Sequence, residues 1–289
     1  MREQWIDVSS HNGKIDWPKA AAQIRGAVLR AGYGNSAAQA DGRFSENIRG
    51  AVAAGLKVAV YWFGYPDSER DARAEWTACK QVIEPYRKEI LFVAYDYEYE
   101  SENYYQKRRG TAPARALINN MANAFLGAAA ADGWTPVLYL NQDYRKNVYD
   151  AATLASWRLW LADYSGREEE NASCAIRQTS STGKVPGISG SVDMDTVFLD
   201  FSKKTIVEID TTMDLSRTRG QYYTVKTVCS RPVALTAGTG GVVTVVPFPK
   251  TGNTQLFALV AVGDPGTAAG IYTAAPGEKP LKRFVYKVV

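Results

Sequence analysis

The stretch "ILFVAYDYE" (90–98) decides the fold, because it joins a strand-like apolar run to two acidic side chains. Side chains alternate between the two faces of a β-strand. One face therefore carries Phe92, Ala94, Asp96 and Glu98, and the other carries Leu91, Val93, Tyr95 and Tyr97. We expect the first face to line the interior of a barrel and the second face to pack beneath helices.

Strand and helix signals alternate from residue 1 to about residue 201. The other strand-like runs are "WIDVS" (5–9), "AVLRAGYG" (27–34), "KVAVYWFGY" (57–65), "PVLYLN" (136–141), "LWLADYS" (159–165), "CAIRQTS" (174–180) and "VDMDTVF" (192–198). Helical patterns begin near Pro18, end at Gly55, and cover 68–84 and 112–131, whereas helices are short or missing after the fifth strand. Eight such strands predict an α/β fold, an irregular TIM-like (β/α) barrel built on a parallel sheet with fewer than eight helices.

The pattern of the sequence changes after about residue 202. Short β-rich runs separated by turn-rich segments such as "PKTGN" and "DPGT" predict a small, antiparallel, sandwich-like all-β domain. We expect a catalytic barrel over 1–203, a linker over 204–216 and the β domain over 217–289. From residue 206 onward the chain has nine Lys and Arg against five Asp and Glu. This excess could favour an anionic cell-wall polymer as partner, or it could be a chance imbalance on a solvated face.

Composition excludes several classes of function. Three widely spaced cysteines and a single histidine, His11, argue against a disulfide framework, a zinc site and a multi-histidine metal centre. We expect neither a cofactor nor a metal. No apolar run reaches the roughly 18 residues of a membrane span, and "KRR" (107–109) is too short to indicate nucleic acid. The N-terminus shows no signal-peptide pattern, which predicts a removed leader or a phage or prophage lysin released through a holin.

Two further acids occupy strand positions equivalent to those of Asp96 and Glu98. Asp7 lies on the first strand and Asp193 on the last, and these strands are neighbours in a closed barrel. The active site of such a barrel lies at the C-terminal ends of its strands, where Asp96 and Glu98 fall. Crowded carboxyl groups disfavour joint ionisation, so we expect Glu98 to hold a proton as a general acid must. Glu100 is interpreted as a solvated loop acid.

Several ordered motifs accompany these acids: "IDVSSHNGKIDW", "RAGYG", "DGRFSENIRGAVAAGLKVAVYWF", the Asp-x-Glu of "YDYE", "LWLADYS" and "QTSSTGKVPGISGSVDMD". Over roughly residues 5 to 200 the chain resembles the lysozymes of glycoside hydrolase family 25, which are bacterial and phage muramidases. Two departures concern fine substrate contacts. Trp62 stands where the family often has His, and Asp195 stands where it often has Asn.

The resemblance implies retaining cleavage of the β-1,4 bond between N-acetylmuramic acid and N-acetylglucosamine in bacterial peptidoglycan. Glu98 matches the general acid/base, Asp96 its partner, Asp7 the acid of strand one and Asp193 the acid of the last strand. Asp96 could attack the sugar directly, or the substrate's own 2-acetamido group could do so, with Asp96 and Asp193 orienting it. The separation of the carboxyl groups that would decide between these routes is not readable from sequence.

Sugar-binding sites use aromatic faces. Tyr61 and Tyr139 share parity with inward-facing positions, and Tyr33, Tyr65 and Trp160 lie near other strand ends. Three alternatives stay open at this level. The protein could bind cell walls without catalysis, could use Asp7, Asp96 and Asp193 as Mg²⁺ ligands, or could hydrolyse another N-acetylated glycan such as chitin. The β domain could equally be a spacer or a dimerisation unit.

Overall fold

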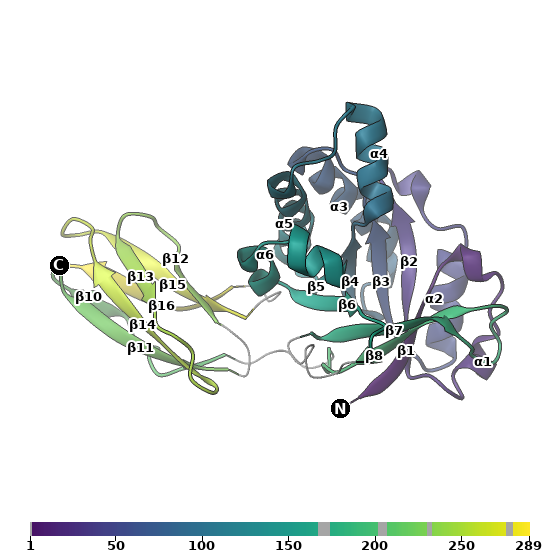
Figure 1. The fold of residues 1–289 in the computed structure, drawn as a ribbon. Helices are drawn as coiled ribbons and strands as arrows, with labels where there is room; N and C mark the ends of the chain where they lie inside the picture. Colours follow the sequence, from purple (N-terminus) through teal and green to yellow (C-terminus); the bar gives the residue numbers. More distant parts are fainter. Residues whose placement is uncertain (1, 167–173, 202–206, 230–232, 276–279) are drawn as a thin grey trace. The chain divides into compact units, whose positions relative to one another are not determined.

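The computed structural model describes residues 2–166, 174–201, 207–229, 233–275 and 280–289. The chain forms two compact units, residues 1–202 and residues 203–289 (Figure 1). Within the described residues, no helix combines the length and the apolar character needed to cross a membrane. Each unit is considered by itself below.

The first unit is built on a closed barrel of eight strands in sequential order. The strands are β1 (Glu3–Val8), β2 (Gly26–Tyr33), β3 (Lys57–Phe63), β4 (Ile90–Asp96), β5 (Pro136–Asn141), β6 (Arg158–Ala162), β7 (Ile176–Gly183) and β8 (Val192–Val197). The predicted eight-stranded barrel is thus confirmed, but the expectation of an all-parallel sheet is wrong. Strand β8 runs antiparallel to both β7 and β1. Residues 184–191 between β7 and β8 are too few for a crossover, which needs a dozen or more residues, so these two strands form a hairpin.

Helices cover the outside of the barrel and are more numerous in its first half (Figure 1). They are α1 (Trp17–Ala20), α2 (Phe44–Ala53), α3 (Glu69–Ile83), α4 (Tyr99–Arg109), α5 (Arg115–Ala131) and α6 (Ala151–Ser156). Pro18 lies in the first turn of α1, and Gly55 follows α2 with a φ of 77°, as the sequence predicts. Helix α4 was not predicted, because "YESENYYQKRR" has no apolar stripe and Ser101 is its one buried residue.

Strand β4 separates two apolar layers, one inside the barrel and one beneath the helices. Phe92 and Ala94 pack inside the barrel, whereas Val93, Tyr95 and Tyr97 pack against the helix layer. This confirms the predicted faces with one correction. Leu91 packs with the interior set, because the register between β3 and β4 shifts after Ile90. The regular alternation that brings Asp96 and Glu98 to one face therefore begins at Phe92.

The second unit is a β-sandwich of two four-stranded sheets, ordered β10-β16-β15-β12 and β13-β14-β11-β9. Its strands are β9 (Glu208–Ile209), β10 (Leu215–Arg217), β11 (Tyr222–Val228), β12 (Ala234–Ala237), β13 (Val243–Pro247), β14 (Thr254–Ala261), β15 (Ala268–Ala274) and β16 (Leu281–Val288). Val225, Phe257, Ile271 and Tyr286 share the core between the sheets. Pairing is antiparallel, as predicted, except between β10 and β16. Strand β9 and the first two residues of β10 fall within the segment 204–216 expected as linker, of which 204–206 lies outside the described residues.

Candidate active site

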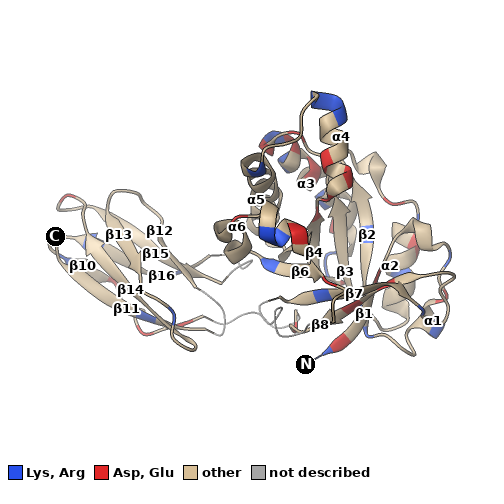
Figure 2. Ribbon diagram, in the orientation of Figure 1, with Lys and Arg blue, Asp and Glu red and all other residues tan. Residues whose placement is uncertain are grey.

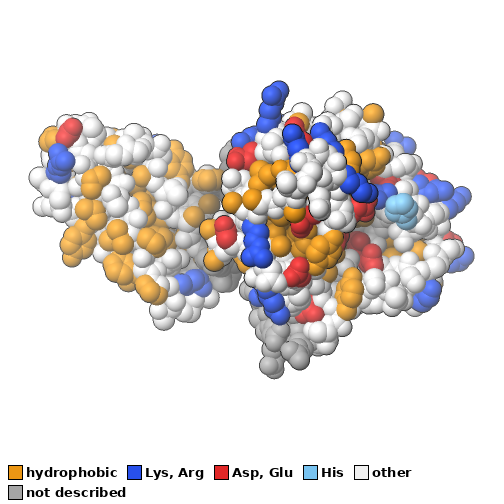
Figure 3. Space-filling view, turned by 45° about the horizontal axis from the view of Figure 1, so that its top comes forward, with side chains coloured by type: hydrophobic (Ala, Val, Ile, Leu, Met, Phe, Trp, Pro, Cys, Tyr) orange, Lys and Arg blue, Asp and Glu red, His pale blue; other side chains and the backbone are white. Residues whose placement is uncertain are grey.

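Four acidic side chains converge at the end of the barrel where β1 and β4 terminate. Asp7 is the fifth residue of β1, Asp96 ends β4, and Glu98 lies directly before α4. Asp193 pairs in register with Asp7 across β8 and β1. The reversed direction of β8 explains this meeting, because it brings the beginning of β8 to the end of β1. Figure 3 shows acidic side chains gathered among hydrophobic ones on the forward-turned face of this unit.

Asp7 stands at the centre of a buried cluster with Asp193 and Asp195. Burial, and then the charges of Asp195 and Asp193, raise the pKa of Asp7 well above its usual 3.8. Asp7 forms hydrogen bonds with both neighbouring carboxyl groups, and its Oδ2 accepts one from Gln178 Nε2 at 2.8 Å. Two acids and one amide thus fix the position of a protonated Asp7.

Asp195 and Gln178 were not among the predicted site residues, although Asp195 stood out as a departure from the family pattern. Asp195 is 0% exposed, and burial raises its pKa to about 7, although Trp160 Nε1 donates a hydrogen bond to its Oδ1 at 2.7 Å. Gln178 Oε1 accepts hydrogen bonds from the hydroxyl groups of Tyr139 and Tyr164, at 3.2 and 2.7 Å. The spacing of Asp193 and Asp195 placed both on one strand face, a signal that could have identified Asp195.

Asp96 and Glu98 form a second carboxyl pair, joined by a hydrogen bond. Burial, followed by the charge of Glu98, raises the pKa of Asp96 well above its usual 3.8. Burial also raises the pKa of Glu98, aided by the charges of Asp193 and Glu100 and opposed by the hydrogen bond with Asp96. Asp96 is buried whereas Glu98 is half-buried, so the pair has one member that solvent can reach.

Three of the predicted aromatic residues gather around these acids. The rings of Tyr61 and Tyr139 meet Trp160 edge-on, with centroid distances of 6.2 and 4.9 Å. Burial raises the pKa of Tyr139 well above 10, and the carboxylates of Glu98, Asp96 and Asp7 add to that rise. Tyr139 is therefore within electrostatic reach of both groups of acids, which places them near each other at the same end of the barrel.

The other two predicted aromatic residues, Tyr33 and Tyr65, lie apart from the carboxyl cluster. They contact each other edge-on at 6.1 Å and line a separate pocket. Glu100, expected in a solvated loop, is exposed but belongs to α4, and its carboxylate accepts a hydrogen bond from the hydroxyl of Tyr65 at 2.8 Å. Tyr164 is a further aromatic that sequence reasoning did not single out. It is 56% exposed, and its hydroxyl is held above the acids by Gln178.

Charged groups of the opposite sign are scarce beside these acids. The Arg30 guanidinium lowers the pKa of Asp96, but it also binds Asp41, with Nε 2.8 Å from Oδ2. Burial raises the pKa of Asp41, yet hydrogen bonds from the amides of Ser10 and Arg43 and from Arg30 bring it below 3.8. Within the described ranges, no three His, Cys, Asp or Glu side chains are arranged to hold a metal ion. The arrangement is suited to proton transfer between carboxyl groups.

Paired carboxyl groups at the mouth of a barrel, one of them protonated, are the machinery with which glycoside hydrolases cleave sugar bonds. Fold and site together define that class. The model of the family described as glycosyl hydrolases family 25 matches residues 6–188, more than half of the chain. The chain belongs to glycosyl hydrolases family 25, as its motifs predict. No curated protein matches it.

Solved structures share the fold. The modular autolysin LytC of Streptococcus pneumoniae is 23% identical with a TM-score of 0.59, and the match covers 68% of this chain and 47% of LytC. A lysozyme of Streptomyces coelicolor is 22% identical, with a TM-score of 0.55 over 68% of this chain and 91% of that one. The spore cortex lytic enzyme SleM of Clostridium perfringens is 14% identical, with a TM-score of 0.61, and the match covers 99% of this chain and 98% of SleM. The chain spans about half the length of LytC.

Proposed function

We propose that the protein is a lysozyme that hydrolyses the β-1,4 bond between N-acetylmuramic acid and N-acetylglucosamine in bacterial peptidoglycan. The observation that carries this proposal is the hydrogen-bonded pair of Asp96 and Glu98, which lies within electrostatic reach of Asp193, itself paired in register with Asp7. Family membership supports the reaction class. The LytC autolysin, which shares the fold, has been solved with a synthetic peptidoglycan ligand, which supports the choice of substrate.

Glu98 is the proposed general acid and base. It is the more exposed member of the pair, and a substrate that covers it removes water and raises its pKa further. Asp96 then supplies the neighbouring negative charge. Glu98 gives its proton to the leaving oxygen and later takes a proton from the incoming water, so the same group serves both steps.

The spacing of the pair bears on the nucleophile. In a retaining enzyme with a direct nucleophile, the two carboxyl groups stand about 5 Å apart on either side of the bond. Asp96 and Glu98 are hydrogen-bonded to each other, which is too close to flank a glycosidic bond. We therefore place the 2-acetamido oxygen of the substrate as nucleophile, with Asp96 and Asp193 orienting the amide. A covalent sugar adduct on Asp96, sought by mass spectrometry of the intact protein, would contradict this route.

The decisive experiment is digestion of purified cell wall followed by mass spectrometry of the fragments. A muramidase leaves muramic acid at the reducing end, whereas a glucosaminidase leaves N-acetylglucosamine, and chitin serves as the rival substrate. Glu98→Gln should slow release by roughly 10²- to 10⁴-fold. The matched control is Glu89→Gln, the same change in an exposed residue before the opposite end of β4. Wall binding without release by the unaltered protein would instead indicate a non-catalytic binding protein.

The second unit is proposed to hold the enzyme on anionic wall polymers, on the basis of its excess of Lys and Arg. Its sheet β13-β14-β11-β9 also exposes apolar side chains, Tyr222, Val246 and Leu256, which favour the alternative of dimerisation. Sedimentation of the full chain with walls, before and after removal of their anionic polymers, separates the two. Salt-sensitive binding that is lost with those polymers supports tethering, and a concentration-dependent dimer without such binding supports the alternative.

A further inference from the structure

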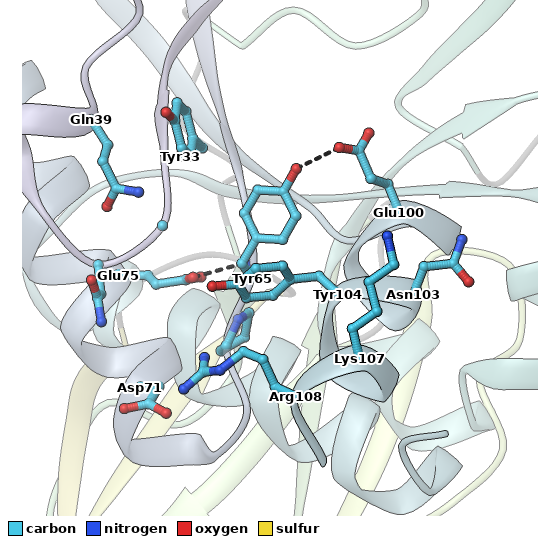
Figure 4. Close-up of a pocket in the computed structure, with 13 residues that line it drawn as sticks. Tyr33, Gln39, Tyr65, Asp71, Glu75, Glu100, Asn103, Tyr104, Lys107 and Arg108 are labelled. Carbon is cyan, nitrogen blue, oxygen red and sulfur yellow. Dashed lines mark hydrogen bonds between the residues drawn. The ribbon is translucent and has the colours of Figure 1, made fainter. Parts of the chain in front are cut away.

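A pocket of 510 Å³ lies beside the carboxyl cluster and is not used by the proposed chemistry. Its walls come from the segments after β2 and β3 and from helices α3 and α4 (Figure 4). Tyr33, Tyr65 and Tyr104 contribute three aromatic rings, and Tyr65 meets Tyr104 at a centroid distance of 5.0 Å. Gly34 closes the side formed by the segment after β2. The pocket is therefore lined by aromatic rings and is large enough for a small ligand.

Glu75 provides an acidic group at the base of this pocket. It is 1% exposed, and its Oε1 accepts a hydrogen bond from the Tyr65 amide at 2.8 Å. Its Oε2 has no hydrogen-bond partner among the described residues. Burial raises the pKa of Glu75 to about 8, and the charge of Asp71 adds to the rise. A buried oxygen without a partner is costly, so a ligand that supplies one is favoured here.

The opposite wall of the pocket is basic. Lys107 and Arg108 lie in the last turn of α4, while the acidic residues of that helix lie in its first turn (Figure 2). The guanidinium of Arg108 lies 5.5 Å from the ring centre of Tyr104 and 3.2 Å from Asp67. Lys107 is exposed and makes no ion pair within the part of the chain that is described. The pocket thus offers a cationic wall, aromatic rings and a buried carboxyl group to one ligand.

We infer that this pocket binds the short peptide that peptidoglycan carries on its muramic acid residues. A peptide of this kind carries carboxylate groups, ammonium groups and alanine methyl groups, which suit the cationic wall, the buried carboxyl group and the aromatic rings of the pocket. A neutral sugar would use the rings but leave the cationic side chain of Lys107 without a role. The inference rests on the proposed function, because it assigns the pocket to the same substrate.

The position of the pocket fits a peptide attached to a sugar in the cavity. Glu98 and Glu100 belong to the same turn at the start of α4, and the hydrogen bond between Tyr65 and Glu100 forms the pocket wall on that side. The charge of Glu100 contributes to the raised pKa of Glu98, so the two carboxyl groups lie close together. Three extended residues span about 10 Å, which is more than the two residues of chain from Glu98 to the pocket residue Glu100 can span.

Steady-state cleavage of two substrates tests the inference. One is intact peptidoglycan with its peptides, and the other is the same glycan stripped of peptides by an amidase. We expect Lys107→Ala and Tyr104→Ala each to reduce kcat/KM on the intact material by about tenfold, the loss of one charge-assisted or aromatic contact. On stripped glycan the same variants should change kcat/KM less than twofold. Lys88→Ala, an equal change of charge at an exposed site before β4, is the matched control.

Two outcomes would overturn the inference. Equal losses on both substrates would make the pocket a sugar subsite, and unchanged rates on both would show that it is not used. If the unaltered protein cleaves neither substrate, the proposed function fails and peptide binding is measured directly. Calorimetric titration with the tripeptide L-alanyl-γ-D-glutamyl-L-lysine should then saturate in the unaltered protein and weaken about tenfold in Lys107→Ala. Absence of saturation at millimolar tripeptide would refute the inference by itself.

Discussion

Asp195→Asn should make the barrel more stable at neutral pH. The change keeps the size of the side chain, and the amide oxygen can still accept the hydrogen bond from Trp160 Nε1. The amide nitrogen takes the place of an oxygen that faces Asp7, and it can donate a hydrogen bond to that carboxyl group. The variant therefore removes one buried acid without leaving a cavity.

The direction of the pH effect follows from where protons are bound. The pKa of Asp195 is about 7 in the folded protein and about 3.8 in the unfolded chain. Between these values the folded state keeps a proton that the unfolded state has lost, so stability falls as pH rises from about 4 to about 7. At about 1.4 kcal/mol per pH unit, the full loss is about 4 kcal/mol. About 3 kcal/mol of it falls between pH 5 and pH 8.

Urea unfolding at pH 5 and pH 8, followed by tryptophan fluorescence, measures this difference. All seven tryptophans precede residue 203, so the signal reports the barrel alone. Between these two pH values, the free energy of unfolding of Asp195→Asn should fall by about 3 kcal/mol less than that of the unaltered protein. Glu89→Gln, an exposed acid-to-amide control, should follow the unaltered protein. A variant with unchanged pH dependence, or one less stable at pH 8, would refute a protonated Asp195.

Three further outcomes are expected. Glu98→Gln should lower the rate of wall hydrolysis by roughly 10²- to 10⁴-fold while the circular dichroism spectrum stays unchanged; near-normal activity would exclude it as the general acid. Gly50→Ala should destabilise the barrel by about 1–3 kcal/mol in urea, because its Cβ would lie 2.2 Å from Trp17 Cδ1. Gly127→Ala has open space and should instead stabilise α5 by up to about 1 kcal/mol, so equal effects would contradict the packing argument. EDTA should leave hydrolysis unchanged, and activity lost to EDTA and restored by Mg²⁺ would favour the metal-dependent alternative.

The barrel was predictable because its strands are local features of the sequence. Apolar runs such as "KVAVYWFGY" and "PVLYLN" stand between turn signals and helical patterns, and their number indicates closure. The alternation of side chains along a strand predicts that the two acids of "YDYE" lie on one face. The adjacency of the first and last strands predicts that Asp7 and Asp193 lie on neighbouring strands, but the antiparallel direction of β8 is what brings them into register.

The features of the fold and the site that the sequence did not predict depend on tertiary contacts, which leave weaker signals in the local sequence. The reversal of β8 is set by a short connection, which does not alter the apolar pattern of the strand itself. Gln178 opens the motif "QTSSTGKVPGISGSVDMD", but the polar run "QTSS" gives no local sign that this one side chain is buried. Glu75 had a recognisable signal, because it lies three residues after Ala72 and next to Trp76 on the buried face of α3. An acid on that face points to a pocket or a partner.

The position of Glu98 at the start of a helix explains why Asp96 and Glu98 share a proton, which neither of them holds alone. Glu98 is the last residue before α4, and the Ser101 hydroxyl accepts a hydrogen bond from its amide at 3.2 Å. The N-terminus of a helix favours negative charge, so α4 opposes the effect of burial on Glu98. Asp96 lies deeper and has no helix directly after it, so burial acts on it more strongly. We propose that a proton held mainly by Asp96 passes to Glu98 when a substrate displaces the water that stabilises the Glu98 carboxylate, so that Glu98 is protonated when the leaving oxygen requires a proton.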